Sequence, residues 1–296
     1  MNFGDFTDGS NATPSDYLVG YASGGGAGSD RRWPVSGVAR EKLASSRTYY
    51  VRTDGSDSND GLANTAAGAF LTIQAAIDAV ADLDINNNSV TIQVAAGTYA
   101  ATVTVSGPWV GGNSVTLLGD ATTPSNVQIS PASGSCVTLT GYSIMNISGF
   151  KLVSTTGSAL NLVRFSHLAV TGAMDFGACA AGHHFSIQSC SRITVGANYN
   201  ITGSAVSHIA SQEHAVWLGS GLTVTLTGTP AFSTGYAFCN GGSLIKQYTA
   251  TFSGSATGVR FVLQTNGVID TNGGGATYFP GDSAGTGDGQ AGGLYA

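Results

Sequence analysis

Short apolar segments recur along the second half of this chain at a nearly constant spacing. They begin near Val137, Leu160, Phe185, Ile209, Phe238 and Phe261, so that successive starts lie 23, 25, 24, 29 and 23 residues apart. A fixed period of this size, built from short strands, is typical of a solenoid in which every repeat is one coil stacked on the coil before it. The repeat therefore predicts a parallel β-solenoid rather than a globular domain.

Aligning successive coils supports this prediction, because strand-like segments fall above one another. The first coil has segments 137–140 and 143–153, the second has 160–163 and 167–176, and the third has 185–188 and 192–201. A parallel stack of this kind is long and rigid, and it presents flat faces to solvent.

Composition agrees with a folded β-protein and excludes some partners. The chain contains 43 glycines, only 9% charged residues and 42% hydrophobic residues, which is too apolar for disorder and too rich in glycine for a helical bundle. The net charge is −6, and the 11 basic residues are scattered along the chain. Binding to nucleic acid or to an anionic membrane is not expected, because both need clustered Lys and Arg.

The cysteines and the N-terminus indicate no redox motif, membrane insertion or export signal. Cys136, Cys179, Cys190 and Cys239 have no C-x-x-C spacing, so we expect them to be small buried apolar residues. The sequence has no apolar run long enough to span a bilayer. The first basic residue is Arg31, which does not fit a secretory signal, and synthesis in a cytoplasm is expected.

Composition divides the chain into four parts. Residues 1–46 form a separate N-terminal segment with a short helix-like stretch over 37–45, and residues 47–84 hold a first strand, 49–52, and a helix, 70–82. The solenoid is expected over 85–272, followed by a Gly-rich tail over 273–296. Apolar residues at helical spacing in 70–82 predict an amphipathic helix that caps the N-terminal end of the stack.

Two stretches resemble known families. The segments 50–61, 70–77 and 90–99 resemble the opening of pectate-lyase-like right-handed parallel β-helix proteins. Residues 16–21 and 31–35 are similar to the N-terminal segment of tail fibre and tailspike proteins of tailed bacteriophages, and the Gly-rich ending is similar to endings of such proteins.

The resemblance implies an all-β, right-handed parallel β-helix with an N-terminal capping helix. It further implies a virion component that is made in the bacterial cytoplasm, is attached to other phage tail or virion proteins through residues 1–46, and forms a homotrimer. Proteins of this kind bind or cut the polysaccharide on the surface of the host.

Cleavage of a polysaccharide by hydrolysis requires a pair of carboxylates, roughly 5 to 9.5 Å apart. Between residues 85 and 281 the acidic residues are Asp120, Asp175, Glu213 and Asp270. Lyases of the resembled superfamily use a calcium-binding cluster of acids and a basic residue, and the coils contain no such cluster in sequence. The sequence therefore leaves enzymatic activity uncertain and leans against a glycoside hydrolase or polysaccharide lyase.

One column of residues carries the candidate sites, because coil alignment places them at the same turn. Glu213, His214 and Arg192 are the candidate catalytic residues, and Arg192 is expected within reach of Glu213. The candidate carbohydrate-binding residues are Tyr142, Arg164, His167, Trp217 and Asn240. The alternative interpretation of the column is a solvated ladder of turns with a single salt bridge.

Aromatic rings stack on sugar faces, so Trp109, Tyr199, Tyr236 and Tyr248 are further candidates, although several are expected in the core or at a subunit interface. No metal or other cofactor is expected. The histidines at 183, 184 and 208 lack a completing acid or cysteine, and residues 54–60 lack the spacing of an EF-hand loop.

Three hypotheses for function follow. The first is a phage tail fibre or tailspike component that contacts host surface polysaccharide. The second is a polysaccharide depolymerase with Glu213 as its acid/base residue. The third is a structural decoration, collar or head fibre that uses a short β-helix as a spacer.

Overall fold

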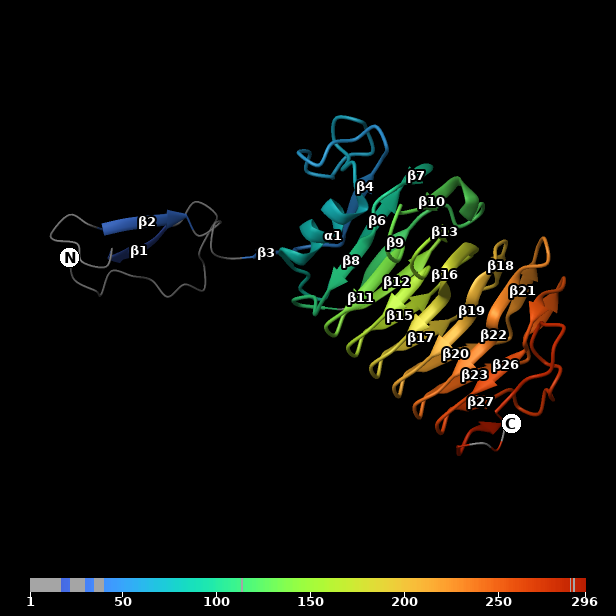
Figure 1. Ribbon diagram of the computed structural model, residues 1–296. Coiled ribbons are helices and arrows are strands. Elements are labelled where there is room, and N and C mark those ends of the chain that lie inside the picture. The colour runs from blue at the N-terminus through green and yellow to red at the C-terminus, as the bar shows by residue number, and fades with distance from the viewer. Residues whose placement is uncertain (1–16, 22–29, 35–39, 113, 288, 290) are drawn as a thin grey trace.

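The computed structural model describes residues 17–21, 30–34, 40–112, 114–287, 289 and 291–296 of the chain. It is an all-β protein, a parallel β-solenoid of about eight turns, with 46% of residues in strands and 5% in helices. The predicted all-β parallel solenoid is confirmed, and the right hand of its winding stays a prediction. Figure 1 shows the coils stacked side by side, from the helix near the N-terminal end to the C-terminus at the other.

Each complete coil contributes one strand to each of three faces. The first face is a ten-stranded sheet. Its strands are β4 (Arg47–Val51), β6 (Val90–Val94), β9 (Val115–Leu118), β12 (Ile144–Ser148), β15 (His167–Val170), β17 (Arg192–Val195), β20 (Val216–Ser220), β23 (Leu244–Tyr248), β27 (Val268–Asp270) and β28 (Leu294–Tyr295).

The second and third faces form one sheet, because the long strand β16 runs through both. The second face has β7 (Gly97–Tyr99), β10 (Val127–Ile129), β13 (Lys151–Ser154), β16 (Asp175–Ile187), β18 (Tyr199–Ile201), β21 (Thr223–Leu226) and β24 (Thr251–Ser253). The third has β8 (Val103–Ser106), β11 (Val137–Thr140), β14 (Leu160–Leu162), the end of β16, β19 (Ala205–Ser211), β22 (Ala231–Cys239) and β26 (Phe261–Leu263). β25 (Thr257–Gly258) pairs with the start of β22, in the row of Cys179 and Ala205.

The register confirms the repeat that the sequence predicts, except at one coil. Val137, Leu160, Phe185 and Ile209 are successive partners along the third face. The next partner in that row is Ala237, not Phe238, and Phe261 follows it. The expected start at Phe238 is therefore wrong by one residue. Ala237 is fully buried and Phe238 is only half-buried, so the smaller residue faces the core.

Buried and partly exposed residues alternate along the strands, and the buried ones form the core. In β6, for example, Val90, Ile92 and Val94 are buried while the residues between them are partly exposed, which is the period of a strand buried on one side. Toward the C-terminal half the core becomes aromatic. Phe176, Phe185, Tyr199, Trp217, Phe232 and Tyr236 are all buried there.

The helix expected over 70–82 is α1 (Ile73–Ala81), and it packs on β4, β6 and β8. It begins where it does because Thr72 accepts a hydrogen bond from the Ala75 amide, while Asp57 accepts from the amides of Leu71 and Thr72. The turn-rich loop before α1 therefore holds the helix start. That α1 caps the solenoid stays a prediction.

The two ends of the chain add smaller elements. β1 (Tyr17–Tyr21) pairs antiparallel with β2 (Asp30–Pro34) in the segment 1–46, most of which lies outside the described residues. β3 (Glu41–Lys42) pairs with β5 (Leu83–Asp84), so the helix-like stretch expected over 37–45 is wrong for residues 40–45, and residues 37–39 lie outside the described part. A 3-10 helix, η4 (Pro124–Asn126), precedes β10.

The Gly-rich tail covers the C-terminal end of the core. Phe279 is buried with its ring 5.3 Å from that of Tyr236, and Tyr295 stacks on Phe261 at 4.0 Å between ring centroids. β28 adds a last short strand to the first face. A two-residue strand limits the open edge that a stack of this kind would otherwise expose.

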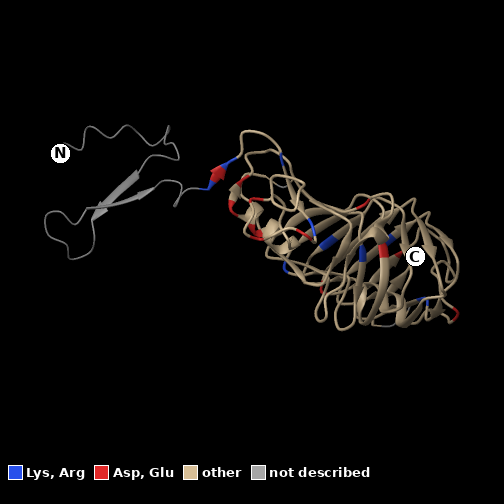
Figure 2. Ribbon diagram, turned by 90° about the horizontal axis from the view of Figure 1, so that it is seen from above, with Lys and Arg blue, Asp and Glu red and all other residues tan. Residues whose placement is uncertain are grey.

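The coils carry few charged residues, and most of the cysteines are buried. Figure 2 shows the acidic and basic residues gathered near α1 and thinly spread over the coils. Three of the four cysteines are buried as expected, whereas Cys190 is exposed, which contradicts the prediction for that residue. Within the described residues, no helix is both long and apolar enough to cross a membrane.

Candidate functional site

A row of two-residue turns joins the third face to the first face in successive coils. We call this row the turn ladder, and it forms the line of tips along the lower edge of the solenoid in Figure 1. Both residues of each turn have positive φ, between 45° and 75°. The pairs are 141–142, 164–165, 189–190, 213–214, 241–242, 265–266 and 291–292.

Hydrogen bonds hold neighbouring turns together. The Tyr142 amide donates to the Arg164 carbonyl, the Phe165 amide to the Ser189 carbonyl, and the Cys190 amide to the Glu213 carbonyl, at 3.0–3.1 Å. The residue after each turn is small, and the serines at 143, 166, 191 and 243 are buried. A left-handed backbone costs a non-glycine residue about 1–2 kcal/mol, so the ladder holds many unfavourable conformations in one column.

Two aromatic side chains project from adjacent rungs of the ladder. The rings of Tyr142 and Phe165 are stacked, with centroids 5.2 Å apart and planes 6° from parallel. Tyr142 is 61% exposed and Phe165 is 53% exposed, in a molecule whose other aromatic residues mostly lie in the core. This exposed aromatic pair is a preformed apolar surface on which a flat molecule could stack.

Two arginines flank the aromatic pair. Arg164 precedes Phe165 and lies next to Tyr142 through the rung hydrogen bond, and Arg192 donates its amide to the carbonyl of Ser166 at 2.8 Å. Both arginines are exposed, and neither side chain makes an ion pair or hydrogen bond with the described residues. His167, the register partner of Arg192, lies beside them. Its pKa is lowered by partial burial and then by the charge of Arg192, so it is neutral at pH 7.

Glu213 and His214 occupy a later rung. The Ser189 hydroxyl donates to the Glu213 carboxylate at 2.8 Å, which turns Glu213 toward the aromatic pair. His214 lies in the other direction, because a Cβ on Gly242 would be 3.1 Å from two atoms of its ring. The rung of Cys190 lies between those of Phe165 and His214, and the His214 ring lies away from it, over Gly242.

The structure places most of the predicted column on this ladder. Tyr142, Arg164, Glu213 and His214 are ladder residues, and Asn240 comes immediately before the turn at 241–242. Arg192, however, pairs in register with His167 and Val216, and the expected contact with Glu213 is not among the ion pairs of the described residues. The catalytic roles proposed for Glu213, His214 and Arg192 stay predictions.

Trp217 is wrong as a carbohydrate-binding residue. It is fully buried, with its ring 6.2 Å from that of Phe185, because it lies at an inward position of β20. The further aromatic candidates are also engaged within the molecule. Trp109, Tyr199 and Tyr236 are buried, and the half-buried Tyr248 donates its hydroxyl to Asp270.

A chain of buried hydrogen bonds runs through the aromatic core. Nε2 of His184 lies 2.9 Å from the Gly177 carbonyl, Nδ1 of His184 lies 2.9 Å from Nδ1 of His208, and Nε2 of His208 lies 2.9 Å from the Tyr199 hydroxyl. A carbonyl only accepts, so His184 donates from Nε2 and accepts at Nδ1. His208 therefore donates from Nδ1, and Tyr199 donates to its Nε2. Both histidines are neutral in this arrangement.

Within the described part of the chain, these histidines are not grouped with further metal-binding side chains. His183 lies next to them on β16 but is half-buried, and among the described residues no three His, Cys, Asp or Glu side chains are grouped to hold a metal ion.

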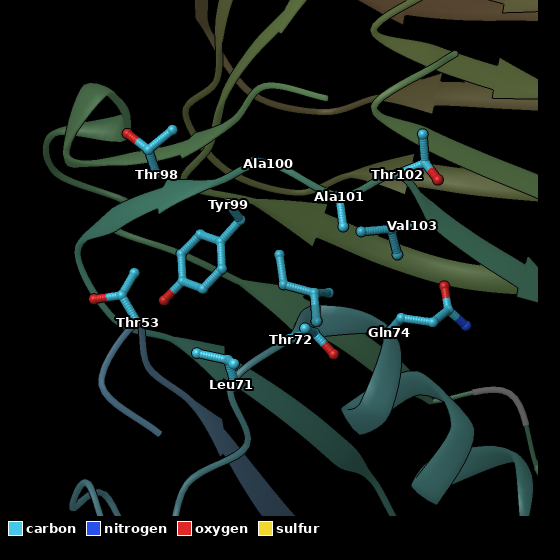
Figure 3. A pocket seen from close by; sticks show the side chains of 11 residues that line it. Thr53, Leu71, Thr72, Gln74, Thr98, Tyr99, Ala100, Ala101, Thr102 and Val103 are labelled. Atoms are coloured by element: carbon cyan, nitrogen blue, oxygen red, sulfur yellow. The ribbon is translucent and has the colours of Figure 1, made fainter. Parts of the chain in front are cut away.

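A concave region lies beside α1. It has a volume of about 410 Å³ and is formed between the start of the helix and residues 98–103 (Figure 3). Thr53, Leu71 and Thr98 border it, and no charged residue lines it. The amide of Gln74 is already bonded to the main chain of Thr104. The region offers hydroxyl and methyl groups but nothing that selects a particular ligand.

Phe165 and Cys190 are the site residues that the sequence reasoning missed. A signal for them exists, since a small residue recurs immediately after each turn, as in Tyr142-Ser143, Phe165-Ser166 and Cys190-Ser191. Aligning the coils on that small residue would place Phe165 directly beside Tyr142.

No protein-family model, curated protein or solved structure matched this chain.

Proposed function

We propose that this chain is a fibre- or spike-type component of a tailed-phage particle that binds host surface polysaccharide through the turn ladder. The observation that carries the proposal is the exposed aromatic pair, Tyr142 and Phe165, held in left-handed turns on adjacent coils. The stack imposes this backbone conformation and so holds the two rings in place, and stacked exposed rings suit the apolar face of a sugar. The phage location rests on the sequence resemblance alone.

Binding without cleavage is the activity that fits these residues. Glu213 is the single carboxylate among the described turn-ladder residues, whereas glycoside hydrolysis needs two. The depolymerase hypothesis therefore has no second acid at this site.

Lateral self-association is the second part of the proposal. Val216, Leu244, Val268 and Leu294 are successive register partners on the outer side of the first face, and none of them is fully buried. Four aliphatic side chains in one outward column favour packing against another copy of the chain. We propose a homotrimer, attached to the particle through residues 1–46.

The test is binding of the purified full chain to an array of bacterial surface oligosaccharides. We expect binding, and we expect the double variant Tyr142→Ala/Phe165→Ala to lose at least about 10-fold in affinity, since two stacking rings are removed. Leu62→Ala is the matched control, because Leu62 is 49% exposed and far from the ladder in sequence. Absence of binding to every glycan would contradict the proposal and favour a purely structural virion role.

A further inference from the structure

The residues around the aromatic pair also indicate the charge of the sugar that binds. We propose that the turn ladder selects an anionic saccharide, one whose ring bears a carboxylate or a phosphodiester, and that Arg164 and Arg192 bind the anionic group. This inference rests on the proposed function and narrows it to a class of glycan.

The first argument is the state of the two guanidinium groups. The other arginines with described side chains are engaged: Arg47 with Glu41, Arg52 with Asp54, Arg40 with a carbonyl of α1 and Arg260 with the Ser283 carbonyl. The side chains of Arg164 and Arg192 have no such partner among the described residues. In a chain of net charge −6, two guanidinium groups on adjacent coils without an ion pair among the described residues are the cationic site of this proposal.

The second argument is the position of these groups relative to the rings. The amide of Tyr142 bonds the carbonyl of Arg164, and the amide of Arg192 bonds the carbonyl of Ser166, at 3.1 and 2.8 Å. Arg164 is therefore on the coil after that of Tyr142, and Arg192 is on the coil after that of Phe165. A sugar ring stacked on the aromatic pair would have a guanidinium within reach, and a guanidinium binds a carboxylate or phosphate through two parallel hydrogen bonds.

The third argument concerns room for the ligand. Beyond Phe165 the next rung carries only Ser189 and Cys190, and the ring of His214 lies over Gly242 on the far side. Adjacent coils are separated by about 4.8 Å, so two rungs leave about 9.6 Å between the backbones at Phe165 and His214. The small Cys190 thus forms the floor of an open gap next to the aromatic pair.

Glu213 sets the direction in which the ligand binds. Its carboxylate is held by Ser189 on the rung beyond Phe165, so it limits the cationic site on that side. The anionic group of the ligand should lie near Arg164 and Arg192, and the neutral part of the ring should lie toward Glu213. Removing the Glu213 charge should then strengthen the binding of an anionic glycan.

The experiment uses the purified full chain on an array that holds uronate- or sialate-bearing, phosphodiester-linked and neutral bacterial oligosaccharides. Bound glycans should be anionic, and the two anionic groups on the array separate carboxylate from phosphodiester ligands. For the best carboxylate ligand, Arg164→Gln and Arg192→Gln should each weaken binding about 10-fold, and Glu213→Gln should tighten it about 2-fold. For the carboxyl-reduced form of this ligand, the affinity should change by no more than about 2-fold in each of the three variants. Arg260→Gln is the matched arginine control.

Cys190 gives an independent readout, because it is the exposed cysteine among the four. Bound anionic glycan should slow the alkylation of Cys190 by iodoacetamide in the wild-type protein at least 5-fold. Bound glycans that are all neutral, or arginine variants that bind as the wild type does, would overturn this inference and leave the proposed function standing. No bound glycan at all would remove the proposed function and this inference with it.

Discussion

The buried pair His184 and His208 is the residue-level feature with the clearest energetic consequence. Burial lowers the pKa of His184 to about 3, and burial followed by the charge of His184 lowers the pKa of His208 well below its usual value of 6.5. The hydrogen-bonded chain cannot form with both rings charged, because each of the two facing Nδ1 atoms would then carry a proton. No carboxylate is hydrogen-bonded or ion-paired to either ring in the described residues.

The buried hydrogen-bonded row through His184 and His208 predicts a loss of stability in mild acid. A histidine whose folded pKa lies below its unfolded pKa contributes fully to stability above about pH 6.5, and it loses that contribution as the pH falls toward the folded pKa. Below pH 6, each histidine should lower the free energy of unfolding by about 1.4 kcal/mol for every unit by which the pH falls. The pair should therefore lower it by about 2.7 kcal/mol per pH unit. The window from pH 6 to 4.5 lies above the range in which most carboxylates titrate.

Urea unfolding measured at several pH values in this window tests the prediction. The double variant His184→Gln/His208→Gln should show a pH slope smaller by about 2–3 kcal/mol per unit than the wild type. His167 and His183, whose pKa values are also lowered by burial, contribute equally to both proteins. Equal slopes for wild type and variant would show that the buried pair does not control the acid response.

At the level of the element, the turn ladder is held by the stack and not by the preferences of its own residues. Residues such as Thr265, Phe165 and Glu213 adopt positive φ although glycine is the residue that does so without cost. Rung-to-rung hydrogen bonds and the strands on both sides impose this conformation. Glycines stand in the ladder at 241 and 242, where the same backbone is free of strain.

Thr265→Gly should therefore stabilise the protein. Thr265 is exposed and β-branched with φ of 45°, so glycine relieves about 1–2 kcal/mol of strain and loses about 0.5–1 kcal/mol through added chain entropy in the unfolded state. We expect a net gain of about 0.5–1 kcal/mol in unfolding free energy by urea denaturation. Thr138→Gly in β11, where the backbone is extended, is the matched control and should lose about 1 kcal/mol. A loss at residue 265 as large as that at 138 would contradict the prediction.

The elements also show what the sequence could and could not predict. The sequence predicts the solenoid and the helix within 70–82, because strands bury every second residue, whereas the helix buries Ile73, Ala76, Ile77 and Val80 at helical spacing. The start expected at Phe238 is off by one residue because two apolar residues are adjacent there, and the period alone does not decide which of them faces the core; it is Ala237. The sequence predicts a carbohydrate-binding role for Trp217, but its side chain faces the core, because a shift of one position along a strand moves a side chain to the opposite face.

At the scale of the whole molecule, a stack of coils has three outer faces, and their chemistry differs. The second face is polar on the outside, with Asn200, Thr202 and Thr225 outward. The first face carries the outward aliphatic column, and the same column holds His167 and Arg192 earlier in the chain. The first face thus combines an apolar half near the C-terminus with Arg192 of the proposed glycan site toward its other end, next to the turn ladder.

Self-association through the apolar half can be tested by light scattering over a range of protein concentrations. The wild-type protein should have three times the chain mass of 29.8 kDa, and Leu244→Asp should shift the mass to that of one chain, because it places a charge at the centre of the column. Thr225→Asp on the second face is the matched control and should leave the mass unchanged. A wild-type mass of 29.8 kDa at all concentrations would exclude the trimer, while a trimer unaffected by Leu244→Asp would place its interface on another face.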